Sequence, residues 1–260
     1  MNHIREARMG PANTWKTGAV VGTYPRPLLV LEGDEHGLSV IRDPVEVVDT
    51  AGLRLLAAKP REALPPLTAV YFDPHPPSTG SVLIKEFGTV PDKETFPVFV
   101  EMFNVLFDVG CPWKTVVLDP LTRLNEIVQR YHASVKAGEL ADPRKWASSI
   151  GQKVAQVVYA LKMLECHIVV ILHASIDKDE LTGQVSYSPM LYSRFRDSIS
   201  NVMAQFVFAK LDKGQAVVLT RDDGYVTGLG CKWPTGLPAK VGPTFNDIYG
   251  NAVKTGETYA

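Results

Sequence analysis

The sequence has little cysteine and no long apolar run. Cys111, Cys166 and Cys231 lie far apart and form no C-x-x-C pair or Cys/His cluster, so the sequence indicates neither a disulfide framework nor a structural zinc site. No apolar stretch approaches the roughly 18 residues that a membrane-spanning helix needs. The opening residues MNHIREARMG also lack the apolar core of a signal peptide. We therefore expect a cytoplasmic protein with no membrane partner.

An excess of positive charge is also absent. The formal net charge is −1, which excludes a protein coated in positive charge for nucleic acid, so any nucleic-acid contact must come from a local patch. Apolar residues make up 45% of the chain and charged residues 21%, a balance that predicts a packed core rather than disorder. The sequence contains no internal repeat and no low-complexity block.

Apolar runs that do not alternate with polar residues predict buried strands. LLVLEGDE, TVVLD and HIVVILHAS are typical of strands buried on both faces of a parallel sheet, and VEVVDT and TAVYFD are further candidates. Apolar residues at helical spacing predict helices over residues 94–110, 146–165 and 194–206. We therefore expect an α/β fold in which a mostly parallel twisted sheet carries helices on both faces, closed by a C-terminal β-hairpin region.

One domain over residues 1–250 is the simplest organisation. We expect irregular insertions at 52–97, where prolines are concentrated, and at 120–148. Residues 251–260 are expected to form a flexible tail. The first strand, in HIREARM, is a weak candidate because it carries three charged residues where a central strand should be apolar.

The segment MGPANTWKTGAVVG resembles a phosphate-binding loop. Gly10, Lys16 and Thr17 fit the frame G-x-x-x-x-G-K-[ST], in which backbone N–H groups cradle phosphates, the lysine bridges phosphate oxygens and the hydroxyl binds Mg²⁺. ATP and Mg²⁺ are therefore the expected cofactors, with Thr17 as a metal ligand. The residues expected to bind the nucleotide are Gly10, Pro11, Ala12, Asn13, Thr14, Trp15, Lys16 and Thr17.

Trp15 departs from this frame because it stands where the second glycine belongs. A tryptophan forced to adopt positive φ there would be strained by ~1–3 kcal/mol. The alternative interpretation of the segment is a Gly-Pro turn before an ordinary helix.

Two acidic features strengthen the nucleotide-binding interpretation. TVVLDP has the form of a Walker B strand, with Asp119 at its carboxyl end in position to hold Mg²⁺ and its water shell. The cluster EGDEHG directly follows the strand LLVL, and a carboxylate there can polarise the attacking water. The alternative for EGDEHG is a solvated acidic turn.

An ordered series of segments resembles the RecA-type core of phage recombination ATPases, specifically the Sak-type single-strand annealing group. The series is GPANTWKT, LVLEGDEHGL, TVVLDPLTRL and HIVVILHAS, followed by DKDELTGQVSYSPMLYSRFRDSI. The resemblance covers residues 9–245 and implies a RecA-like P-loop NTPase core. It implies that Glu35 activates water and that Asp119 is the Walker B acid. It also implies that His173 senses the γ-phosphate, although a core histidine bonded to a backbone carbonyl is the alternative.

The same resemblance implies assembly into a ring or filament in which a neighbour contributes a cation to the active site. CKWPTG keeps Lys232 but has Trp233 and Pro234 where an arginine could stand, so Lys232 is the candidate that acts in trans. These two departures from the family pattern, Trp15 and CKWPTG, put fast hydrolysis in doubt.

The resemblance further implies that single-stranded DNA binds the loops at 120–148 and 174–193. Cations interleaved with aromatic rings suit a strand binder that tolerates any sequence, although a solvated helix face is the alternative. The predicted DNA contacts are Arg123, Arg130, Lys136, Arg144, Lys145, Lys178, Tyr187, Arg194 and Arg196.

The sequence therefore predicts an ATP-binding RecA-like protein that promotes annealing or recombination of single-stranded DNA in the cytoplasm of a phage-infected bacterium. A single-strand DNA-binding protein is a further expected partner. Two other functions stay open. One is a degenerate P-loop subunit that coats DNA with little turnover, and the other is a different P-loop motor, such as a packaging or helicase-loading ATPase.

Overall fold

The computed structural model describes residues 3–34, 37–72, 92–135, 143–181, 183, 185–191, 193–226, 228–232 and 237–255. Its strands are β1 (Arg5–Gly10), β2 (Leu28–Glu32), β3 (Glu46–Val47), β4 (Leu67–Tyr71), β5 (Thr115–Asp119), β6 (His167–Lys178), β7 (Val185–Pro189), β8 (Gln205–Asp212), β9 (Gln215–Leu219), β10 (Gly230–Cys231) and β11 (Lys240–Val241). Its helices are α1 (Lys16–Thr23), α2 (Thr50–Ala57), α3 (Asp92–Asp108), α4 (Leu121–Val135), α5 (Pro143–Met163), α6 (Ser193–Val202) and α7 (Phe245–Thr255), with short 3₁₀ turns η1 (Gly37–Val40) and η2 (Arg61–Ala63).

The strands of the described residues form one mixed sheet in the order β11-β9-β8-β1-β6-β5-β2-β4-β3. From β8 to β3 all neighbours on this path are parallel. The antiparallel pairs are β8 with β9 and β10, β9 with β11, and β6 with β7. The strand that leads into the phosphate loop, β1, and the strand that ends in Asp119, β5, are therefore separated only by β6.

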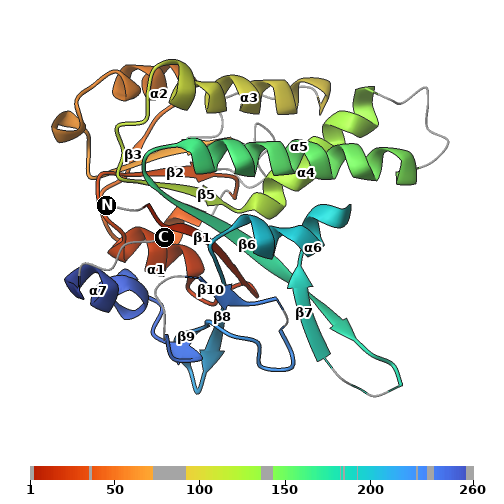
Figure 1. Ribbon diagram of the computed structural model, residues 1–260. Helices are drawn as coiled ribbons and strands as arrows, with labels where there is room; N and C mark the ends of the chain where they lie inside the picture. The colour runs from red at the N-terminus through yellow and green to blue at the C-terminus, as the bar shows by residue number, and fades with distance from the viewer. Residues whose placement is uncertain are drawn as a thin grey trace.

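Helices cover both faces of the sheet (Figure 1). Helices α2 to α6 pack on one face around a core that includes Leu53, Phe99 and Leu124, while α1 and α7 pack on the other around Val20 and Tyr249. The central strands are apolar on both sides because each side meets a helix layer. The predicted fold class, an α/β fold with a mostly parallel sheet, helices on both faces and a C-terminal β-hairpin, is confirmed.

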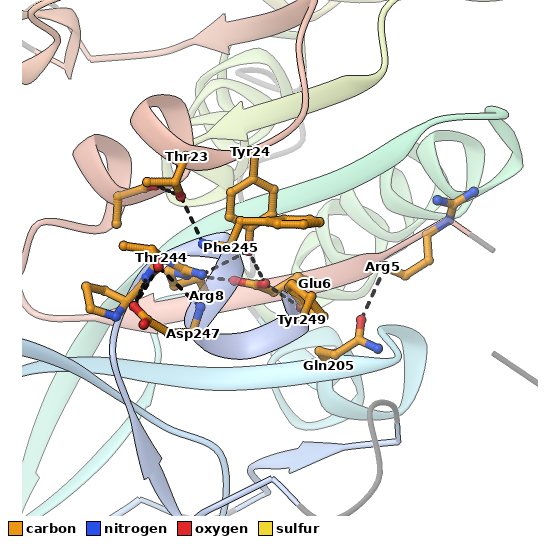
Figure 2. A network of polar contacts seen from close by, with 12 residues as sticks. Arg5, Glu6, Arg8, Thr23, Tyr24, Gln205, Thr244, Phe245, Asp247 and Tyr249 are labelled. Atoms are coloured by element: carbon orange, nitrogen blue, oxygen red, sulfur yellow. Dashed lines mark hydrogen bonds and ion pairs between the residues drawn. The ribbon is translucent and has the colours of Figure 1, made fainter. Parts of the chain in front are cut away.

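The charged first strand is central, which contradicts its description as a weak candidate. The side chains of Glu6 and Arg8 are fully buried, and Arg8 Nε donates to Glu6 Oε1 over 2.6 Å. Tyr24 and Tyr249 both donate hydroxyl hydrogen bonds to Glu6 Oε2, and Arg8 donates to the Pro243 carbonyl (Figure 2). The buried charges are tolerated because they are paired and hydrogen-bonded.

Several boundaries differ from the sequence predictions, and the supposed irregular insertion at 52–97 contains most of α2 and the strand β4. Residues 251–255 belong to α7 rather than to a flexible tail, since Ile248, Tyr249 and Ala252 of this helix are buried, while 256–260 lie outside the described residues. The supposed insertion at 120–148 begins with the regular helix α4. The predicted helix 194–206 ends at Val202, because Gln205 and Phe206 already pair with β1 as the start of β8.

Candidate functional site

The predicted nucleotide-site residues lie at one edge of the sheet. The strands β1, β6, β5 and β2 are parallel, so their carboxyl ends meet at the same edge. Gly10 is in register with His173, and Asp119 is in register with Glu32. The topology thus gathers the residues that the sequence predicted as phosphate loop, Walker B acid and sensor, which are far apart in the sequence.

The segment between β1 and α1 forms a compact loop around the Lys16 side chain. Lys16 is buried, and its Nζ donates to the carbonyl oxygens of Gly10 at 3.0 Å and Pro11 at 2.6 Å. Asn13 and Trp15 have positive φ angles of 59° and 61°. Burial lowers the pKa of Lys16 to about 8, although the nearby Asp119 and Asp34 act in the opposite direction. The loop therefore curls around the Lys16 ammonium group, which its carbonyl oxygens hold in place.

Trp15 does adopt the left-handed conformation that the missing glycine would have supplied. It is the N-cap residue of α1, with φ 61° and ψ 26°, and makes no side-chain capping hydrogen bond. A Cβ placed on Gly18 would lie 2.6 Å from the indole Nε1. The indole therefore packs directly on Gly18, and the loop accommodates it because Gly18 has no side chain.

Thr17 and Asp119 lie in contact, as a shared metal site requires. Thr17 Oγ1 donates a hydrogen bond of 2.5 Å to Asp119 Oδ2. Burial, with a smaller contribution from the charge of Asp34, raises the pKa of Asp119 to about 6, although the hydrogen bond from Thr17 and the charge of Lys16 oppose the rise. The carboxylate is thus held in an environment where a cation would stabilise its charged form.

Glu32 is a site residue for which the sequence analysis proposed no separate role. It ends β2 beside Asp119, is fully buried, and has a raised pKa because of burial and the Asp119 charge. Its Oε1 accepts from the Asp34 amide at 2.8 Å, but its Oε2 has no hydrogen-bond partner within the described part of the chain. Gly37 lies over it so closely that a Cβ there would be 2.4 Å from the carboxylate oxygens. The signal was present, since LLVLE ends in an acid as TVVLD does.

His173 lies beside the acidic residues rather than in the core. Its Nε2 is 3.5 Å from Asp34 Oδ2, and about a third of its side chain is exposed. Its backbone N–H donates to Thr122 Oγ1, and its carbonyl accepts from the Met190 amide after β7. His173 therefore links the predicted nucleotide site to α4 and to the base of the β6–β7 hairpin. Glu35, the expected water-activating residue, lies outside the described residues.

The side chains present suit Mg²⁺ bound together with a nucleotide. Among the described residues, no group of three or more His, Cys, Asp or Glu side chains is arranged to hold a metal by itself. Mg²⁺ in nucleotide sites needs only one or two protein oxygens, because phosphates and waters complete its shell. Thr17 and Asp119 would supply those oxygens, and the buried Glu32, whose Oε2 has no hydrogen-bond partner among the described residues, lies beside Asp119.

Lys232 lies at the opposite edge of the sheet from its own phosphate loop. Its backbone N–H donates to the Ala204 carbonyl, and the preceding Cys231 pairs with Gln205 at the start of β8. Because β8 runs parallel to β1, the start of β8 lies at the edge where β1 begins. The loop between β1 and α1 lies at the other edge, where β1 ends. Within one chain, Lys232 therefore lies away from the predicted nucleotide site.

The predicted DNA contacts are distributed over several elements. Arg123 and Arg130 lie on α4, and Arg123 packs against Gly33 near the site while pairing with Glu126. Arg196 is exposed on α6. Lys136 lies outside the described residues, and for Arg144, Lys145 and Arg194 only the helix backbone is described.

The β6–β7 hairpin is poorly suited to hold phosphates. Lys178 lies at its exposed end beside Asp177, Asp179 and Glu180, so negative charge predominates there. Tyr187 is directed inward, with its ring centroid 5.0 Å from that of Phe208. It lines a pocket of about 540 Å³ between the phosphate loop, β7, β8 and the segment 223–226.

The sequence matches no protein-family profile and no curated protein. Among solved structures, a prototypical ATPase from the type III secretion system of pathogenic bacteria aligns over 80% of this chain and 51% of its own, with 10% identity and a TM-score of 0.41. The KaiC-like protein PH0186 from Pyrococcus horikoshii OT3 aligns over 82% of this chain and 76% of its own, with 11% identity and a TM-score of 0.36. The chain thus spans about half the length of the type III secretion ATPase chain. Likenesses this remote bear on neither the activity nor the partners of this chain.

In the part of the chain that the structure describes, every helix is too short or too polar to cross a membrane.

Proposed function

We propose that this protein is a RecA-like P-loop ATPase that binds ATP with Mg²⁺ at the loop between β1 and α1. The observation that carries the proposal is the hydrogen bond from Thr17 to Asp119, which joins the residue after the loop lysine to the acid at the end of β5. A Gly-Pro turn before an ordinary helix would not require that contact. It would also not require a buried lysine enclosed by the loop.

Each residue of the site has a role that its position supports. The amides of the loop and the start of α1 hold the β- and γ-phosphates, and Lys16 exchanges its loop carbonyls for phosphate oxygens. Thr17 and Asp119 hold Mg²⁺, which when bound neutralises the charge that develops on the phosphates. Glu32 lies buried beside Asp119 and, with Glu35, is a candidate to orient the attacking water.

His173 is placed to transmit the state of the nucleotide to the rest of the protein. The imidazole pairs with Asp34 at the site, and the His173 carbonyl accepts from Met190, the residue that follows β7. A shift of this residue on γ-phosphate loss would therefore move the β6–β7 hairpin. Such coupling requires two states that differ in affinity for the second ligand.

The second ligand is single-stranded DNA, which the protein anneals or recombines, consistent with a phage origin. The support is the resemblance of the ordered motifs together with Arg123, which lies on α4 against Gly33, and Arg196, which is exposed on α6. Assembly into a ring or filament would bring the Lys232 of one copy to the nucleotide of the next. A single-strand DNA-binding protein is a further candidate partner.

ATP hydrolysis measured with and without single-stranded DNA tests this proposal. We expect the wild type to hydrolyse ATP faster when DNA is added, and Lys16→Ala to lose that turnover. Lys59→Ala is the matched control, because Lys59 is exposed and lies just after α2, which packs on the face opposite α1. Turnover that DNA does not change would support another kind of P-loop motor instead.

A second candidate function is a DNA-coating subunit that binds nucleotide without turnover. The observation that favours it is the strained loop, in which Trp15 has positive φ and Lys16 is bonded to two loop carbonyls. Tight DNA binding without hydrolysis by the wild type would establish this alternative and exclude the ATPase.

A further inference from the structure

A large aromatic side chain lies exposed beside the phosphate loop. Half of the surface of Trp15 is accessible to solvent, and its side chain belongs to neither hydrophobic core. Most tryptophans bury their rings, because the ring surface is large and apolar. Trp113, for comparison, is completely buried. The exposure of Trp15 therefore needs an explanation other than core packing.

The position of the indole is fixed relative to the phosphate site. Trp15 directly precedes Lys16 and Thr17, and its ring lies on Gly18, the residue that follows them, with 2.6 Å between the indole Nε1 and the Cβ that Gly18 lacks. The N–H groups at the start of a helix have no partner within the helix and are the ones that bind phosphate. The indole thus lies at the first turn of α1, at the edge of the phosphate site.

Two locally unfavourable residues maintain this arrangement. Trp15 adopts a left-handed conformation that a glycine would adopt freely, and Gly18 occupies the first turn of a helix, where alanine is the better helix former. Both residues are needed for the ring to lie along the turn, because a side chain at position 18 would displace it. The left-handed Trp15 and the helical Gly18 are each locally unfavourable, and together they place an exposed aromatic ring next to the predicted phosphate site.

We propose that the indole of Trp15 is the surface on which the nucleoside end of the bound nucleotide stacks. This inference rests on the proposed nucleotide site. If the phosphates are held at the loop and at the first turn of α1, the ribose and base extend beyond them, toward the indole of Trp15. Every nucleobase has a π face, so an exposed indole binds the base by stacking. The tryptophan that breaks the loop motif thus becomes a contact that the motif glycine could not make.

Binding of Mg–ATP and of Mg–tripolyphosphate to the same set of variants tests this inference. Tripolyphosphate offers the phosphates without a nucleoside, so stacking on Trp15 contributes only to ATP binding. We expect Trp15→Ala to weaken ATP binding about tenfold and to leave tripolyphosphate binding unchanged, as the loss of one base stack predicts. We expect Trp15→Phe, which keeps an aromatic ring, to retain most of the ATP affinity. Trp15 is exposed, so each variant is expected to fold.

The other outcomes separate this inference from the proposed function. Equal losses for both ligands in Trp15→Ala would show that the tryptophan only shapes the loop, and unchanged ATP binding would show that it makes no contact. Tighter ATP binding by Trp15→Gly would show that the ring obstructs the site. Each of these three results overturns the stacking role and leaves the nucleotide site intact. A wild type that binds neither ligand overturns the nucleotide site itself, and the stacking role with it.

Discussion

At the scale of single residues, Trp15 adopts a left-handed conformation at the position where the phosphate-loop frame expects a glycine. The left-handed conformation at position 15 was foreseeable from the frame around Lys16 and Thr17, because the missing glycine normally provides it. The contact of the indole with Gly18 was not foreseeable, because no pattern relates these two positions. The small residue that the loop needs is present, three positions after the expected one.

The pair Trp15 and Gly18 predicts a non-additive pair of substitutions. Gly18→Ala alone places a methyl group against the indole and should destabilise the protein by about 1–3 kcal/mol, the range for overpacking. In a Trp15→Gly background the same change should be neutral or stabilising, by up to about 1 kcal/mol, because alanine favours a helix. Urea denaturation of both single variants and the double variant measures the coupling. Additive effects would mean that the two residues do not touch.

Asp119 is predicted to lower the stability of the nucleotide-free protein. Its folded pKa of about 6 exceeds that of an unfolded aspartate, so its contribution to stability is present at about pH 4 and is lost as pH rises through 6. Asp119→Asn should therefore be more stable than wild type at pH 7.5, by on the order of 2 kcal/mol, with the gain fading toward pH 4. The exposed Asp108→Asn is the control. A thermal scan in which Asp119→Asn melts lower at pH 7.5 would contradict this sign.

At the scale of elements, a buried hydrogen bond joins β1 to α7, and local sequence patterns do not reveal this contact. Glu6 and Arg8 on a central strand contradict the rule that such strands are apolar. The partners that make them acceptable, Tyr24, Pro243 and Tyr249, come from both ends of the chain. Figure 2 shows Tyr24 and Tyr249 converging on Glu6 and Arg8. A pattern within one strand contains no information on such distant partners, so the sequence analysis misjudged both elements.

This network predicts that the C-terminal helix stabilises the strand before the phosphate loop. Tyr249→Phe removes one of the hydroxyl groups that donate to Glu6 Oε2 and should lower the free energy of unfolding by about 1–3 kcal/mol. Tyr159→Phe removes a hydroxyl from an exposed tyrosine on α5 and should change it by less than about 0.5 kcal/mol. Chemical denaturation measures both. Equal stability of the two variants would mean that Glu6 does not need the second tyrosine.

His167, at the start of β6, predicts a pH-dependent loss of stability. Its Nδ1 accepts a hydrogen bond from the Ile4 amide, and burial, assisted by His3 and Arg5, lowers its pKa to about 4. The unfolded chain therefore binds the proton first, so stability is complete above about pH 6.5 and declines as pH falls to 4, by at most about 3 kcal/mol.

Asn at position 167 keeps an acceptor near that place but does not titrate. The stability of His167→Asn should therefore vary less with pH than that of the wild type between pH 6.5 and 4, as denaturation at several pH values would show. Parallel pH curves for the two proteins would exclude His167 as the source.

At the scale of the whole molecule, the sequence predicted the sheet correctly but not which acidic residues lie side by side in it. The buried runs at β2, β5 and β6 were recognisable because both faces of these strands are covered. Their order in space was not, and that order decides which acids meet. Glu32 lies beside Asp119 only because β2 pairs with β5 in that register, while the resemblance directed attention to Glu35.

The order of the strands also places Lys232 away from the other predicted catalytic residues of the same chain. The phosphate loop, Asp119 and His173 meet at one edge, while Lys232 lies at the other. If Lys232 acts in trans, Lys232→Ala should reduce turnover by about a thousandfold, the lower end of the range for such cations, without weakening ATP binding by a single chain. Mixing Lys232→Ala with Lys16→Ala protein should partly restore turnover, because some interfaces combine an intact loop with an intact lysine. No recovery in the mixture would exclude the trans role.

The central claim is that the loop before α1 holds the phosphates of a Mg²⁺-bound nucleotide. Calorimetric titration with a non-hydrolysable ATP analogue tests it most directly, in Mg²⁺ and in EDTA, for wild type, Lys16→Ala and the Lys59→Ala control. The predicted result is one nucleotide per wild-type and control chain, with affinity at least about tenfold weaker in Lys16→Ala or without Mg²⁺, since each loses a charge-assisted contact. Absence of binding by the wild type, or binding that neither change weakens, would contradict the claim.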